Sequence, residues 1–145
     1  MRTAGILMPI TSLPSPYGVG TLGQCARDFI QFLHRAGQTY WQILPICPTG
    51  YGDSPYQSFS SYAGNPYMID FDDLKKEGLL QEEEYASISW GDNPARVDYS
   101  LLYSHKFSIL RIACSRISGV LSERFQTFCK EQKDRKSTRL NSSHM

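Results

Sequence analysis

The sequence predicts an α/β protein that begins with a parallel β/α sheet or barrel. A short, continuously apolar run at Ala4–Met8 is typical of a strand buried on both faces. Apolar residues then recur at helical spacing between Thr21 and Gly37, and Tyr40–Leu44 has the pattern of a second strand that Pro45 ends. Strand, helix and strand span about 40 residues, the length of one βαβ unit. A parallel pair of strands requires such a crossover.

The first helix has boundary signals at both ends. Thr21 is a candidate N-cap, and Gln24, three residues later, can complete a capping box. Gly37 is a natural stop. The apolar residues that define the helix are Leu22, Cys25, Ala26, Phe29, Ile30, Leu33 and Ala36.

The middle of the chain predicts short elements. Met68–Phe71 has the pattern of another short strand. Asp72 or Asp73 is expected to cap a brief helix that Gly78 ends. Gln81–Tyr85 predicts a second short helix.

The last part of the chain predicts two longer helices. Asp98 is expected to start the first of them, and Ser118 and Gly119 interrupt it. Ser118 or Ser122 is then a candidate cap for a final helix that runs through Cys129.

Composition argues against several classes of protein. The 145 residues carry 15 Lys and Arg against 14 Asp and Glu, a formal net charge of +1, so no nucleic-acid partner is expected. The sequence contains no run of about 18 apolar residues, so no membrane span is predicted. The N-terminus lacks a signal-peptide pattern, so we expect a cytoplasmic protein whose four cysteines are free thiols. No cysteine or histidine pair has metal-ligand spacing, so no metal site is expected.

The segment before the terminal methionine is unlike the rest of the chain. Residues 134–144 have no apolar period, and they match the in-frame translation of a common sequencing-library adapter over all eleven codons. A flexible polar tail is the alternative, but so long a match favours the adapter. We therefore expect residues 134–145 to be a non-native tail and the natural protein to continue beyond Lys133.

A long loop rich in Gly, Pro, Ser and Tyr is expected between Pro45 and Pro66. Because the loop should leave the carboxyl end of the second strand, it lies where β/α proteins bind ligands. Its side chains suit a sugar, since aromatic rings can pack against a pyranose and hydroxyls and amides can bond to it. These side chains are Tyr51, Ser54, Tyr56, Gln57, Ser58, Phe59 and Tyr62. On the residues alone, the alternative that the aromatics merely pin the loop down is about as well supported.

Four blocks of residues in a fixed order are more specific than any one motif. They are Ala4–Leu7 with Thr11–Gly20, Tyr40–Pro45, Pro48–Ser60 and Ala63–Tyr67. Together they closely resemble the N-terminus of the 4-alpha-glucanotransferases, also called amylomaltases or disproportionating enzymes (glycoside hydrolase family 77), and most of all the bacterial type. The resemblance covers roughly residues 2–133 and is strongest up to Asp70.

The resemblance implies a fold that this chain contains only in part. The expected fold is the N-terminal portion of a (β/α)8 TIM barrel with an inserted helical subdomain. Residues 1–133 would supply the N-terminal part of the barrel, and about 71–133 within them a mostly helical insertion.

The resemblance also implies an activity. The family transfers a segment of an α-1,4-glucan to a new 4-hydroxyl with retention, which fits two carboxyl groups about 5–5.5 Å apart. These carboxylates lie downstream of the matched region in the family, so this chain should hold no catalytic residue and be inactive alone. No cofactor is implied, and the expected partners are α-1,4-glucans such as maltooligosaccharides and amylose. The alternative is a self-sufficient, non-catalytic α-glucan-binding module.

Four binding residues carry over from the family to this sequence. Ser54 and Tyr56 match positions that line the donor subsite beside the scissile bond. Tyr51 and Tyr103 match an aromatic pair at a second glucan site outside the catalytic cleft. For Tyr103 the alternative is a tyrosine on a helix surface, packed on the barrel. Asp53 is expected to have a turn role and not to be a nucleophile.

Overall fold

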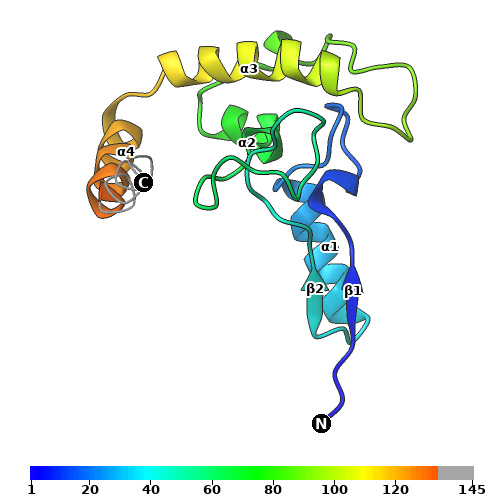
Figure 1. Ribbon diagram of the computed structural model, residues 1–145. Coiled ribbons are helices and arrows are strands. Elements are labelled where there is room, and N and C mark those ends of the chain that lie inside the picture. Colours follow the sequence, from blue (N-terminus) through cyan, green and yellow to red (C-terminus); the bar gives the residue numbers. More distant parts are fainter. Residues whose placement is uncertain (134–145) are drawn as a thin grey trace, which may run out of the picture.

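The computed structural model describes residues 1–133, in which a strand–helix–strand unit is followed by helices (Figure 1). Residues 134–145, the expected adapter segment, lie outside the described residues. In chain order the elements are β1 (Gly5–Leu7), the 3₁₀ helix η1 (Ile10–Ser12), α1 (Gln24–Arg35), β2 (Tyr40–Gln42), the 3₁₀ helix η2 (Pro66–Met68), α2 (Phe71–Lys76), the 3₁₀ helix η3 (Glu82–Glu84), α3 (Tyr99–Ser115) and α4 (Gly119–Glu131).

The predicted parallel pair of strands is confirmed. β1 and β2 pair in parallel, with Gly5 opposite Tyr40, and α1 is the crossover between them. Trp41 of β2 contacts Phe29 of α1 edge to face, with ring centroids 5.0 Å apart. The indole Nε1 of Trp41 also donates a hydrogen bond of 2.8 Å to the carbonyl oxygen of Met8, which fixes the ring at the end of β1.

The prediction that the first strand is buried on both faces is wrong within the described residues, since every residue of β1 is exposed. Side chains alternate along a strand, so Leu7 and Tyr40 lie on the face opposite Trp41 and α1. Leu7 is 56% exposed and Tyr40 61%. An apolar run predicts a buried strand only where elements cover both faces, and in residues 1–133 this sheet has two strands.

The start of α1 depends on a tertiary contact that helix patterns do not contain. Gly23, not Thr21, is the N-cap, and no side chain caps the helix. Thr21 instead donates a 2.6 Å hydrogen bond to Oδ2 of Asp70. Oδ1 of Asp70 accepts from the backbone N–H of Asp73 and caps α2. The cap of α2 is therefore Asp70 and not, as predicted, Asp72 or Asp73. The prediction that Met68–Phe71 forms a strand is also wrong, because η2 ends at Met68 and α2 begins at Phe71.

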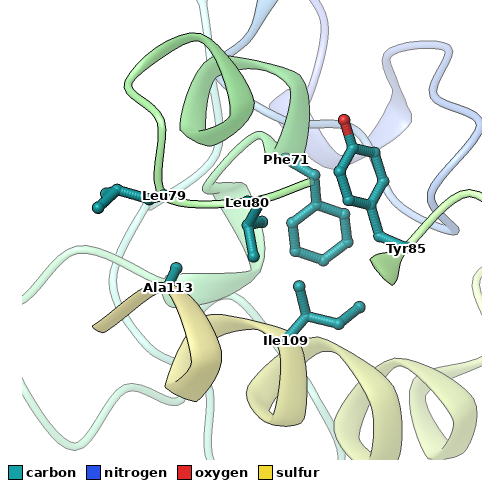
Figure 2. Packing of buried hydrophobic residues seen from close by; sticks show 6 residues of the cluster. All are labelled: Phe71, Leu79, Leu80, Tyr85, Ile109 and Ala113. Atoms are coloured by element: carbon teal, nitrogen blue, oxygen red, sulfur yellow. The ribbon is translucent and has the colours of Figure 1, made fainter. Parts of the chain in front are cut away.

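The main apolar core lies between α2, η3 and α3. Figure 2 shows the ring of Phe71 between the side chains of Tyr85 and Leu80, with Ile109 of α3 facing it. Asp72 accepts hydrogen bonds of 2.8 Å from the hydroxyls of both Tyr17 and Tyr85 at the edge of this core. The buried residues of the cluster are Phe71, Leu79, Leu80, Tyr85, Ile109 and Ala113.

The helices of the second half follow the sequence pattern more closely. Asp98 caps α3 as predicted, because its Oδ1 accepts from the backbone N–H of Leu101 at 3.1 Å. Ser118 is the N-cap residue of α4, without a side-chain hydrogen bond. The predicted short helix at Gln81–Tyr85 is the 3₁₀ helix η3, closed by a capping box between Gln81 and Glu84. Among residues 1–133, no helix is long and apolar enough to cross a bilayer.

Candidate functional site

The loop between β2 and η2 is a hairpin with an ordered base. Thr49 and Ser58 form an antiparallel bridge, and the N–H of Gly50 donates to the carbonyl of Gln57 at 3.0 Å. The N–H of Asn65 donates to the carbonyl of Ile46 at 2.9 Å and closes the loop where it returns to the core. The loop is therefore a folded structure held by backbone hydrogen bonds.

Two successive turns make the tip of this hairpin. In the first, the N–H of Asp53 donates to the carbonyl of Gly50 at 3.2 Å, and Gly52 has the positive φ of 89° that a type II turn needs at its third position. In the second, the N–H of Gln57 donates to the carbonyl of Ser54 at 3.1 Å, with Pro55 at the position that proline favours. Glycine and proline thus stand where the turn geometry requires them.

The tip presents predicted glucan contacts to solvent. Tyr51 is 102% exposed and Tyr56 is 73% exposed, so both rings offer open faces. Ser54 is half-buried, and its Oγ accepts a hydrogen bond of 3.4 Å from the N–H of Tyr56. A surface of flat rings with nearby hydroxyls can pack against and hydrogen-bond to a sugar.

Tyr103 lies on the surface of α3, as the alternative of a helix-surface tyrosine predicts. Its ring is 67% exposed, and it also packs edge to face on Phe107 with centroids 5.5 Å apart. Phe107 in turn contacts Tyr67, in η2 just after the loop, at 5.6 Å. Tyr51 and Tyr103 make no ring contact with each other in the described part of the chain.

A small cavity of about 40 Å³ lies under the hairpin, between its base and the start of α3. Asp53, Tyr67 and Tyr99 are among the residues that line it. Burial raises the pKa of both tyrosines, and the negative charge of Asp53 raises them further. Ligand pockets typically measure about 300–1,000 Å³, so a sugar can contact only the outer surface of this loop. A larger cavity of about 700 Å³ lies between residues 11–20 and 88–97 and is lined by none of the predicted site residues.

Tyr67 and Tyr99 were not predicted from the sequence as part of this site. Tyr99 lies four residues before Tyr103, and residues at that spacing share a helix face. Tyr67 is the last residue of the sequence block Ala63–Tyr67. Helical spacing from Tyr103 could therefore have indicated Tyr99, whereas the approach of both rings to Asp53 depends on the tertiary fold.

The prominent acidic side chains have structural partners. Asp70 caps α2, and Asp72 holds two tyrosine hydroxyls. Arg27 binds both oxygens of Asp73 at 2.7 and 3.1 Å and lowers the pKa of that carboxyl. Arg116 likewise binds both oxygens of Glu84 and lowers its pKa to about 2. Residues 1–133 contain no group of three potential metal ligands.

The hairpin lies in a part of the chain that matches a known protein family. The family model described as 4-alpha-glucanotransferase matches residues 8–137, most of the chain. The chain belongs to this family. The membership expected from the four sequence blocks is therefore confirmed, and the match includes the whole hairpin together with Tyr103.

Relatives in the 4-alpha-glucanotransferase family are much longer than this chain. The enzyme of Clostridium butyricum is 47% identical over 126 residues, which are 87% of this chain and 26% of that protein. The enzyme of Thermus thermophilus is 54% identical over 112 residues, 77% of this chain and 21% of that protein. The solved amylomaltase of Streptococcus agalactiae in complex with acarbose matches 92% of this chain and 27% of its own, with 42% identity and a TM-score of 0.88. The chain thus spans about a quarter of these relatives and has the mixed α/β fold of that part.

Proposed function

We propose that the chain supplies part of the α-1,4-glucan-binding surface of a 4-alpha-glucanotransferase. Ser54 and Tyr56 contact the donor glucan, and Tyr51 and Tyr103 hold a second stretch of glucan. The observation that carries this proposal is the double turn at the tip of the hairpin, which holds Tyr51 and Tyr56 with their rings in solvent. The acarbose bound to the Streptococcus agalactiae amylomaltase, which shares this fold, supports a carbohydrate ligand.

The proposal also includes the fold to which the chain contributes and the source of the catalytic carboxylates. Residues 1–133 form the N-terminal portion of a (β/α)8 barrel with a mostly helical insertion from about residue 71. The retaining transfer step requires two free carboxyl groups about 5–5.5 Å apart. As the resemblance to the family implies, those catalytic carboxylates come from outside this chain, and the contacts of Asp70, Asp72, Asp73 and Glu84 described above fit structural roles. Glucose release from maltotriose by the 145-residue chain would contradict this part of the proposal.

Binding of maltoheptaose, measured by isothermal titration calorimetry on the whole chain, tests the proposed surface. Replacing a stacking ring by alanine removes about 0.5–1.5 kcal/mol, so Tyr56→Ala should weaken binding about two- to twelvefold. Tyr51→Ala and Tyr103→Ala should each weaken the second contact by a similar factor.

A matched control is available on the sheet. Tyr40 is 61% exposed and lies outside the loop, so Tyr40→Ala should leave the affinity unchanged. Equal losses in Tyr40→Ala and Tyr56→Ala would indicate nonspecific stacking and overturn the proposed site. Binding that survives all three substitutions at Tyr51, Tyr56 and Tyr103 would also overturn it.

A further inference from the structure

Among residues 1–133, Asp53 is the one residue other than glycine whose backbone is left-handed. Its φ is 54°, and every other residue of 1–133 with positive φ is a glycine. It follows Gly52, whose φ is 89°, so two left-handed residues stand in sequence. Side chains with a Cβ are disfavoured in this region by roughly 1–2 kcal/mol, and aspartate and asparagine tolerate it better than most.

The half-buried side chain of Asp53 contacts the base of the loop. Oδ1 lies 3.4 Å from the hydroxyl of Thr49, which donates to it across the base of the hairpin. Asp53 lines the small cavity together with Tyr67 and Tyr99, which lie in η2 and at the start of α3. Asp53 thus connects the tip of the loop to the core that carries it.

Asp53 also stands at the junction of the two turns. Its N–H closes the first turn on Gly50, and the next residue, Ser54, opens the second turn toward Gln57. The direction in which Ser54 and Tyr56 leave the loop therefore depends on the φ angle at position 53. An extended backbone there would turn the second turn away from the first.

We propose that Asp53 is a positioning residue for glucan binding, which fixes the orientation of Ser54 and Tyr56 through its left-handed backbone and the contact of its carboxylate with Thr49. This inference rests on the proposed function, since it assigns a cause to the arrangement of the same binding residues. Asp53 does not itself touch the glucan.

Three substitutions separate the backbone contribution from the side-chain contribution. Asp53→Asn keeps an oxygen for Thr49 and tolerates positive φ, so maltoheptaose should bind within about twofold of the unsubstituted chain. Asp53→Gly keeps the backbone conformation but loses the anchor, and affinity should fall about threefold. Asp53→Ala loses both, and affinity should fall about tenfold.

Two further measurements make these results decisive. Thermal unfolding should remain a single cooperative transition in all three variants, because both turns and the contact with Thr49 lie within residues 49–57. Amide chemical shifts of Ser54 and Tyr56 should move in Asp53→Ala and stay near their original values in Asp53→Asn. A purely structural role elsewhere in the fold would change the unfolding transition instead.

Several outcomes would overturn the inference. Asp53→Ala binding as tightly as the unsubstituted chain would remove the positioning role. Asp53→Asn binding as weakly as Asp53→Ala would make the negative charge decisive and indicate direct contact with the ligand. Should Asp53→Ala fail to fold, Asp53→Gly binding as tightly as Asp53→Asn would remove the anchoring role.

The Tyr56→Ala variant distinguishes a failure of the inference about Asp53 from a failure of the proposed function. If Tyr56→Ala weakens binding while Asp53→Ala does not, the proposed function stands and the inference about Asp53 fails. If the unsubstituted chain does not bind maltoheptaose, the proposed function is wrong and the inference falls with it.

Discussion

Lys106 is a charged residue in a place where charge is unfavourable. It is completely buried on α3, with Nζ donating to the carbonyl of Ile69 and lying 4.2 Å from the centroid of the Phe71 ring. Burial lowers the pKa of this amine to about 8, and the charge of Asp70 opposes that shift. The sequence shows only a lysine on a predicted helix, so its burial under α2 follows from tertiary packing and was not predicted.

The titration of Lys106 predicts how stability depends on pH. Between about pH 8 and 10 the unfolded chain keeps a proton that folded Lys106 has released, so the free energy of unfolding should rise with pH. The rise is at most about 1.4 kcal/mol per pH unit for one proton. Urea unfolding at several pH values should show this rise in the unsubstituted chain and in exposed Lys130→Met, and not in Lys106→Met. A flat profile in the unsubstituted chain would contradict the prediction.

Tyr17 sets the upper end of the same pH window. Burial and its hydrogen bond to Asp72 raise the pKa of Tyr17 to about 12. Above about pH 10 the unfolded tyrosine therefore ionises first, and the free energy of unfolding should fall again.

At the scale of elements, α1 and α2 are joined through a cluster of short contacts. Thr21 and Gly23 precede α1, and both meet Asp70, the cap of α2. Arg27 of α1 pairs with Asp73 of α2. Local patterns predicted the cap of α3 at Asp98 because that bond is made within four residues of sequence. They misplaced the start of α1 because Thr21 bonds to a residue 49 positions away.

The contact between Gly23 and Asp70 predicts a sensitive position. A Cβ at residue 23 would lie 2.4 Å from the carboxyl carbon of Asp70, so Gly23→Ala must displace the carboxylate and weaken both of its hydrogen bonds. We expect a loss of about 1–3 kcal/mol in the free energy of unfolding.

A control and a double-mutant cycle test that explanation. Gly64→Ala is the matched control, because a Cβ there meets no atom within 4 Å. In an Asp70→Ala background the cost of Gly23→Ala should shrink, since the crowded carboxylate is gone. Equal losses in the free energy of unfolding for Gly23→Ala and Gly64→Ala, measured by urea unfolding, would contradict the explanation that a Cβ at residue 23 displaces the carboxylate of Asp70.

Part of the candidate site could likewise be predicted from the sequence, and part of it depends on the tertiary fold. A long loop rich in glycine, proline and tyrosine was predictable from residues 48–60. The approach of Asp53 to Tyr67 and Tyr99 was not, because it joins three segments of the chain. Turn chemistry is local, whereas the lining of a cavity is set by how elements pack.

At the scale of the whole molecule, the two-stranded sheet of the described chain has one uncovered apolar face. The sheet has two strands in residues 1–133, and the face opposite α1 exposes Leu7 and Tyr40. Figure 1 shows this pair of strands at one end of the molecule, away from α3 and α4. The parallel βαβ unit was predictable from hydrophobic periodicity, but solvent exposure of its strands depends on how many neighbours the sheet has.

The open sheet predicts concentration-dependent self-association of the 145-residue chain. Unpaired strand edges beside an apolar face favour pairing between copies, and a lysine on that face opposes it. Sedimentation velocity at increasing concentration should therefore show association in the unsubstituted chain and less of it in Leu7→Lys. Val120→Lys is the matched control, because Val120 is 70% exposed on α4, far from the sheet in sequence. A monomer at all concentrations, or equal suppression by Val120→Lys, would show that the sheet does not drive association.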